Sequence, residues 1–183
     1  VQTESETEIY QKLDLHYVPP EHREDRGEFE YYAEHETMDL VQESDIKGVV
    51  HAHSTWSDGK YSIKQMAKAA IDRGYEYLLI TDHSKTAAYA GGLTADEIKQ
   101  QWDEIDALNE LLSSNGENFT VFKGIESDIL SDGTLDYPDD ILEGFDCVIA
   151  SVHNGLEMDA DKMNARFEAA IKNPFTRIVG HPT

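Results

Sequence analysis

The stretch KGVVHAHSTWSDG, residues 47–59, decides the fold class of this chain of 183 residues. Its β-branched beginning predicts a strand that ends on His51 and His53, and a turn-rich segment follows. The next segment, SIKQMAKAAIDRG at 62–74, has the pattern of a helix between a serine cap and a terminating glycine. A strand followed directly by a helix is the βα unit of a mostly parallel sheet.

The same alternation continues along the rest of the chain. A helix is predicted to begin at the capping box of Thr94 and Glu97, and another runs from Asp159 to Lys172. Four further apolar runs predict strands, namely YEYLLITDH (75–83), FTVFKGIE (119–126), FDCVIASVH (145–153) and TRIVGHP (176–182). We therefore predict an α/β fold built around a mostly parallel sheet.

Histidines gather at the ends of these strands. Five of the eight histidines occur there, namely His51, His53, His83, His153 and His181. Parallel strands present their carboxyl ends at one edge, so these side chains should share one mouth with Glu126 and Asp82, which also end strands. A carboxylate among neutral imidazoles can bridge two divalent ions, which activate water and neutralise a phosphoryl group. The cluster predicts metal-dependent hydrolysis without a protein nucleophile.

Each of these residues also has a simpler structural explanation. A single histidine at a strand end is more often a hydrogen-bonded structural group than a ligand, whereas five in register favour a metal site. The Ser-Asp-Gly sequence around Asp58 is also a good turn, so turn chemistry alone explains it equally well. Ser84, Lys85 and Asn154 lie beside the histidine motifs, where each is either a contact for substrate phosphate or an exposed loop residue.

Composition restricts the possible functions. Fifteen basic and 37 acidic residues give a net charge of -22, which repels a nucleic-acid backbone unless cations intervene. Cys147 is the only cysteine, which excludes disulfide frameworks and thiolate zinc sites. Phosphate-loop, dinucleotide-binding and serine-nucleophile motifs are absent. The opening VQTESETEIY lacks a signal-peptide pattern and no long apolar run follows, so we expect a cytoplasmic protein without membrane contact.

Five motifs resemble, in order, those of the PHP (polymerase and histidinol phosphatase) family: HAHSTWSDG, ITDHS, GIESDI, ASVHNG and GHPT. The resemblance covers residues 47–183. DGTLDYPDDIL and NPFTRIVGHPT are similar to the C-terminal PHP domain of bacterial and archaeal family X DNA polymerases. Residues 1–46 are acidic and irregular, and EIYQKLDLHYVPPEHREDRGE resembles the end of the polymerase thumb. The resemblance therefore implies a linker and thumb-like region at 1–46 and a PHP domain at 47–183.

For the fold and the metals, the resemblance implies a distorted seven-stranded (β/α) TIM-like barrel with a trinuclear site. One metal would be held by His51, His53 and Glu126, and a second by Glu126, His153 and His181. Asp58 and His83 would hold the third, with Asp82 orienting His83 from behind. The family takes two further ligands from a late Asp-x-His motif, and the sequence ends at Thr183 before it, so we expect a barrel truncated before its last βα units.

For the activity, the resemblance implies a 3′-5′ exonuclease or 3′-end processing phosphoesterase that acts in DNA repair on 3′ ends, beside a polymerase domain. A metal-bound hydroxide would attack phosphorus, with His53, Glu126 and His153 holding the ions. Two or three divalent ions are implied, and imidazole and oxygen ligands suit manganese, zinc or iron. The alternatives are a stand-alone phosphomonoesterase of the histidinol-phosphatase type and a metal-stabilised scaffold of a polymerase that cleaves nothing.

Overall fold

The computed structural model describes residues 3–35 and 40–182, and the chain divides into two compact units at Asp45. The first unit, Val1–Asp45, contains short helices, and its buried hydrophobic side chains are Val18 and Tyr32. They are α1 (Glu6–Lys12), η1 (Pro20–His22), α2 (Glu28–Glu34) and η2 (Glu43–Asp45). The derivation of this unit from a polymerase thumb stays a prediction.

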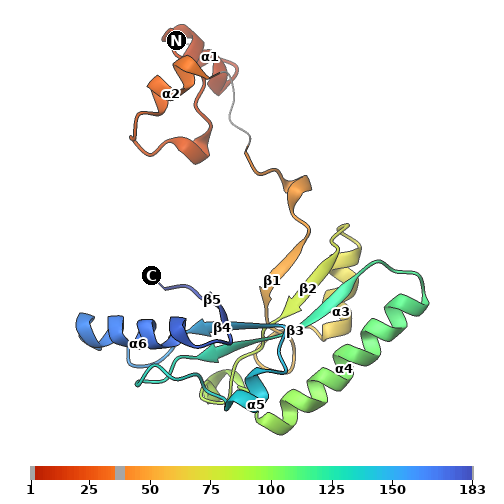
Figure 1. Cartoon of the computed structure of the whole chain (residues 1–183). Helices are drawn as coiled ribbons and strands as arrows, with labels where there is room; N and C mark the ends of the chain where they lie inside the picture. Colours follow the sequence, from red (N-terminus) through yellow and green to blue (C-terminus); the bar gives the residue numbers. More distant parts are fainter. Residues whose placement is uncertain (1–2, 36–39, 183) are drawn as a thin grey trace. The chain divides into compact units, whose positions relative to one another are not determined.

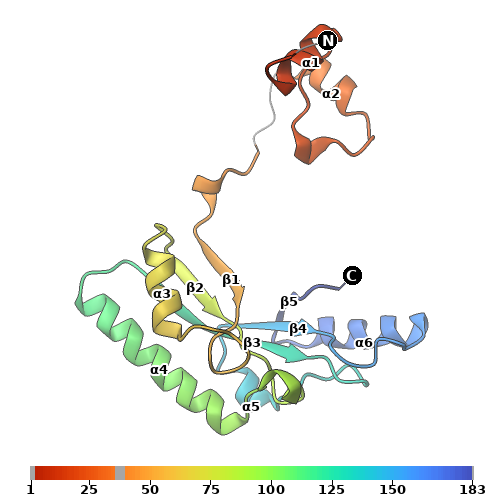
Figure 2. The same ribbon diagram turned by 180° about the vertical axis from the view of Figure 1, so that it is seen from behind.

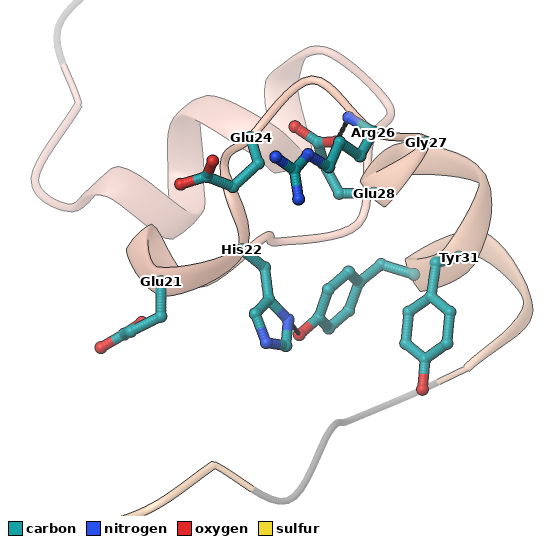
Figure 3. Close-up of a pocket in the computed structure, with 8 residues that line it drawn as sticks. Glu21, His22, Glu24, Arg26, Gly27, Glu28 and Tyr31 are labelled. Carbon is teal, nitrogen blue, oxygen red and sulfur yellow. Dashed lines mark hydrogen bonds between the residues drawn. The ribbon is translucent and has the colours of Figure 1, made fainter. Parts of the chain in front are cut away.

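The first unit carries a small pocket whose residues appear in Figure 3. It is lined by His22, whose Nδ1 lies 2.8 Å from the hydroxyl of Tyr32. The lining also includes charged and aromatic residues, namely Glu21, Glu24, Arg26, Glu28 and Tyr31. In the described part of this unit no group of three metal-binding side chains comes together.

The second unit, Ile46–Thr183, is built on five parallel strands whose order in the sheet is their order in the chain. The sheet curls into a half-barrel, and Figure 1 shows the strands turning steadily from β1 to β5. This arrangement confirms the predicted α/β class. The strands are β1 (Gly48–Ala52), β2 (Tyr77–Ile80), β3 (Thr120–Asp128), β4 (Cys147–Ser151) and β5 (Thr176–Val179).

Helices connect the strands and cover the sheet, as the view from behind in Figure 2 also shows. They are α3 (Ile63–Ile71), η3 (Ala88–Ala90), α4 (Ala95–Ser114), α5 (Asp139–Leu142) and α6 (Ala160–Lys172). Both predicted caps are present, because Ser62 and Gln65 form a capping box for α3, and Thr94 and Glu97 form one for α4. Among the described residues no helix has the length and apolar character that would span a membrane.

The apolar faces of the helices bury two neighbouring clusters against the strands. Under α3 and α4, Ile63, Ile105 and Ile80 are fully buried in one cluster. Under the amino end of α4 and α5, Ile98 and Ile125 are fully buried in the other. Burial of one such side chain stabilises the fold by about 1.5–3 kcal/mol. Both clusters lie between the helices and the strands. The polar side chains lie instead at the carboxyl ends of the strands.

Candidate metal centre

One buried carboxylate lies at the centre of the strand ends. Glu126 near the end of β3 is 1% exposed, and its oxygens lie within 2.8–3.3 Å of an imidazole nitrogen from five different histidines. These histidines follow the strands in order, because parallel pairing sets each strand end beside the next. They are His51 on β1, His53 just after β1, His83 after β2, His153 after β4 and His181 after β5.

The two oxygens of Glu126 divide these neighbours between them. Oε1 lies near His51, His153 and His181 and also accepts a hydrogen bond of 2.8 Å from the hydroxyl of Ser151. Oε2 lies near His53 and His83. A carboxylate offers about four lone-pair positions, so it cannot accept hydrogen bonds from all these groups. Some imidazole nitrogens therefore point their own lone pairs into the site, as metal ligands do.

His83 gives a second sign that the residues fit a metal. Its Nδ1 is buried and has no hydrogen-bond partner, although it lies 3.3 Å from Glu126 Oε2, because that contact lacks hydrogen-bond geometry. On the other side of the ring, Nε2 lies 3.7 Å from Asp58. A buried nitrogen without a partner costs about 1–3 kcal/mol unless something else binds it. A divalent ion between this imidazole and Glu126 would remove that cost.

Three groups of donor atoms are close enough to hold one ion each. The first group is His51, His53 and Glu126, which is the same set that the family resemblance implies for one metal. The other two groups are His53, Asp58 and His83, and His83, Glu126 and His153. The structure thus places His83 in the group with Glu126 and His153 where the resemblance implied His181. The ring of His181 still reaches Glu126, at 2.8 Å.

The carboxylate of Asp82 has a different role from the one expected. It is fully buried, and its hydrogen bonds come from other residues than His83. Oδ1 accepts from the amide of Ser54 and the hydroxyl of Ser57, while Oδ2 accepts from the hydroxyl of Ser54 and from Nε2 of Gln101, at 2.5–2.7 Å. Asp82 therefore fixes the loop that follows His53 and carries Asp58, instead of orienting His83.

Asp128 is a site residue that sequence reasoning missed. It is 2% exposed and lies two residues after Glu126 on β3, so both side chains are on the same face. Its Oδ1 accepts a short hydrogen bond from Nδ1 of His153. This contact leaves Nε2 of His153 to face Glu126, at 3.3 Å. A carboxylate two positions from Glu126 was the available signal, since metal-binding histidines usually donate their second nitrogen to such a group.

Three residues beside the histidine motifs were expected to be either substrate contacts or exposed loop residues, and Lys85 and Asn154 are exposed. Ser84 is fully buried, and its hydroxyl accepts a hydrogen bond from the backbone amide of Asp128. It therefore helps to position Asp128. The ammonium group of Lys85 lies 3.9 Å from the carboxylate of Asp136. The side-chain amide of Asn154 donates to Asp128, at 3.3 Å.

The surroundings shift the pKa values of Glu126 and of two of the histidines. Burial raises the pKa of Glu126, but hydrogen bonds from His51, His53 and Ser151 outweigh that effect and bring its pKa below the ordinary value. Burial also lowers the pKa of His53, yet the adjacent Glu126 leaves that pKa above the ordinary value. For His83, burial and the neighbouring imidazoles lower the pKa. Glu126 is therefore ionised and His83 is neutral near pH 7, the forms that bind metal.

Close backbone packing holds two of the loops that carry these residues. A Cβ atom at Gly59 would lie 2.1 Å from the carbonyl oxygen of His53, so only glycine closes the turn behind Asp58. At Gly180 a Cβ would lie 2.2 Å from the hydroxyl of Ser151, the group that donates to Glu126. The next residue, His181, has a φ of 25°, a conformation that non-glycine residues seldom adopt outside functional sites.

Comparison with known proteins agrees with this geometry. The sequence profile of the PHP domain matches residues 50–178, which include His51, His53, Glu126 and His153. The chain belongs to the PHP domain family. Family membership and the histidine–glutamate cluster together support a metal-dependent phosphoesterase, and the residues of the cluster could hold divalent ions.

Individual relatives differ in the length that the chain covers. It is 48% identical over 179 residues to the DNA polymerase/3'-5' exonuclease PolX of Bacillus subtilis, covering 98% of this chain and 30% of that protein. It is 32% identical over 137 residues to a probable phosphatase of Thermoanaerobacter sp., covering 72% of this chain and 52% of that protein. A probable phosphatase of Syntrophotalea carbinolica is 27% identical over 150 residues, 80% of this chain and 57% of that protein. The chain thus spans about a third of the polymerase and about half of the phosphatases.

Proposed function

We propose that this PHP domain is a 3′-5′ exonuclease or 3′-end processing phosphoesterase within a family X DNA polymerase that acts in DNA repair. The carrying observation is the buried Glu126 with five imidazoles around its two oxygens. The similarity to PolX of Bacillus subtilis, which extends over 98% of this chain, supports the polymerase context. We also propose that residues 1–46 form a linker and the end of a thumb-like region, and that residues 47–183 form the PHP domain.

In this proposal the chain's own residues hold and orient the ions. His51, His53 and Glu126 would hold one ion, His83 and His153 would share another with Glu126, and Asp58 would complete a third position beside His53 and His83. His181 would contribute through its contact with Glu126. When bound, divalent ions supply an activated water and neutralise charge on the phosphoryl group. Manganese, zinc and iron all suit these ligands.

Two further residues prepare the site for that chemistry. Asp128 holds the proton on Nδ1 of His153, which keeps Nε2 free to bind a cation. Ser151 donates to Glu126 Oε1 and thereby fixes the plane of the carboxylate. These contacts preorganise the ligands, so that less reorganisation is needed when substrate binds.

The test pairs metal content with cleavage in the full-length protein. Mass spectrometry should find two or three ions per chain, and manganese should support removal of nucleotides from a 3′-labelled primer. His53→Ala should lose metal and cleavage, whereas His16→Ala, which removes an exposed histidine of the first unit, should change neither. Metal-loaded protein that leaves the primer intact would refute the proposal and favour the scaffold.

A second candidate is a phosphomonoesterase of the histidinol-phosphatase type. It is supported by the 32% identity to a probable phosphatase over 72% of this chain. The two candidates differ in substrate preference, measured as kcat/KM for a 3′-labelled primer against a small phosphomonoester. A clear preference for the monoester would replace the exonuclease proposal with this one.

A further inference from the structure

An exposed tyrosine lies beside the candidate metal centre and is not one of its proposed ligands. Tyr89 lies on η3 in the loop between β2 and α4 and is 71% exposed. The centre of its ring is 6.4 Å from the ring of His83, with the two planes tilted by 53°. Single exposed aromatic side chains are common on protein surfaces, so it is the position beside His83 that distinguishes Tyr89.

The loop that carries Tyr89 is anchored at both ends. Thr86 donates twice to the buried carboxylate of Asp136, and the amide of Lys85 donates to the hydroxyl of Tyr137, at 3.0 Å. The same hydroxyl donates to the carbonyl of Leu93 at the other end of the loop. Tyr137 therefore ties the two ends together.

The interior of the loop is packed as closely as its ends. Ala87 is fully buried, and a Cβ at Gly92 would lie 1.8 Å from the carbonyl oxygen of Ser84. The amide of Gly92 also donates to the carbonyl of Ala87, at 3.1 Å. A loop held in this way presents Tyr89 from a fixed base, so its exposure belongs to a built surface.

The charges around the mouth limit how substrate can be gripped. The chain has a net charge of -22, and Lys85, the cation nearest to Tyr89 in the loop, has its ammonium group beside Asp136. Phosphates would therefore be attracted through the bound ions, and protein cations add little. Aromatic rings grip nucleic acid without charge, because every base has a face that can stack on them. A stacking ring beside a metal site would bind one nucleotide through its base and its phosphate at once.

We propose that Tyr89 is the platform on which the base of the 3′-terminal nucleotide stacks while its phosphodiester lies at the metal cluster. This inference rests on the proposed function and names its substrate class as the ends of single-stranded or frayed nucleic acid. It makes Tyr89 a substrate-binding residue that favours nucleotides over phosphoesters without a base.

The kinetic test uses two substrates and three variants of the full-length, manganese-loaded protein. One primer has a normal 3′-terminal nucleotide, and the other has a terminal abasic residue. Tyr89→Ala should raise KM for the normal primer about 5- to 150-fold, the range that loss of one base–aromatic stack produces, with little change in kcat. Tyr89→Phe keeps the ring and should behave like the wild type. Leu111→Ala removes an exposed side chain on α4 and serves as the control.

The abasic primer separates stacking from damage to the site. Wild type and Tyr89→Ala should have the same KM for it, because the partner of the ring is missing. An equal rise of KM on both primers, or an unchanged KM on the normal primer, would overturn the proposal.

A binding measurement decides the question independently of cleavage. Fluorescence anisotropy of a 5′-labelled oligonucleotide with a terminal phosphorothioate linkage should show weaker binding to Tyr89→Ala only when the terminal base is present. If the wild type cleaves neither primer, the exonuclease proposal fails, yet this measurement still tests Tyr89. Equal affinity of wild type and Tyr89→Ala for the base-bearing oligonucleotide would then refute the platform.

Discussion

Replacing Asp82 should destabilise the fold strongly, and the size of the effect should depend on the replacement. Its two oxygens accept four hydrogen bonds, two from Ser54, one from Ser57 and one from Gln101. Asp82→Ala removes all four acceptors. Among the donors left behind, the Ser54 amide and Gln101 Nε2 are fully buried nitrogens. At about 1–3 kcal/mol for each unsatisfied buried donor, these two alone cost about 2–6 kcal/mol.

Asp82→Asn should cost much less, because the surrounding groups can reverse. An amide nitrogen in the place of Oδ2 would face the hydroxyl of Ser54, which can rotate and accept. It would also face Gln101, whose Oε1 is buried and has no partner, so turning that amide over provides an acceptor. The two hydrogen bonds that Oδ1 accepts, from the Ser54 amide and the Ser57 hydroxyl, are kept. We therefore expect a loss of about 1–2 kcal/mol, the scale of one hydrogen bond to a charged group.

Urea denaturation of the wild type and both variants measures these differences. Asp82→Ala should lower the free energy of unfolding by at least about 2 kcal/mol. The control Asp72→Asn breaks an exposed ion pair with Lys68 and should lower it by less than about 1 kcal/mol. If Asp82→Ala unfolded within about 1 kcal/mol of the wild type, or Asp82→Asn were the less stable of the two, the reasoning about buried acceptors would be refuted.

Three further outcomes concern the metal site. Glu126→Ala should leave the imidazoles without their common carboxylate, and isothermal titration should show at least one manganese ion fewer per chain. Asp128→Ala should weaken metal binding about 10- to 100-fold by releasing Nδ1 of His153, read by the same titration. Lowering the pH should release metal, because protons compete for imidazole nitrogen; since Glu126 raises the pKa of His53, manganese affinity measured by titration should begin to fall at a higher pH than an ordinary histidine would give. Retention of full metal at pH 5 would contradict this.

The fold was largely predictable because each βα unit signals its own boundaries. The strand at 47–53 and the caps of Ser62 and Thr94 are local features, and they appear in the structure where the sequence places them. The convergence of the five histidines also follows from local information, since parallel strands bring their carboxyl ends together. Periodicity and capping were enough for both.

The partners of the buried carboxylates were not predictable in the same way. The family resemblance implied that Asp82 orients His83, but its carboxylate accepts hydrogen bonds from Ser54 and Gln101 instead. Gln101 reaches Asp82 from the inner face of α4, and only the packing of that helix on the sheet determines this contact. Asp128 was missed because its partner His153 is 25 residues away.

The agreement between strand order and chain order also has a consequence for synthesis. As the chain leaves the ribosome, the segments of β1 and β2 emerge with His51, His53 and His83 before Glu126 has been synthesised. The last partner, His181, follows Glu126 by 55 residues, which takes roughly 3–11 s at about 5–20 residues per second. A metal ion captured by the nascent chain would first meet these imidazoles together with Asp58, and would acquire the bridging Glu126 only when β3 joins the sheet.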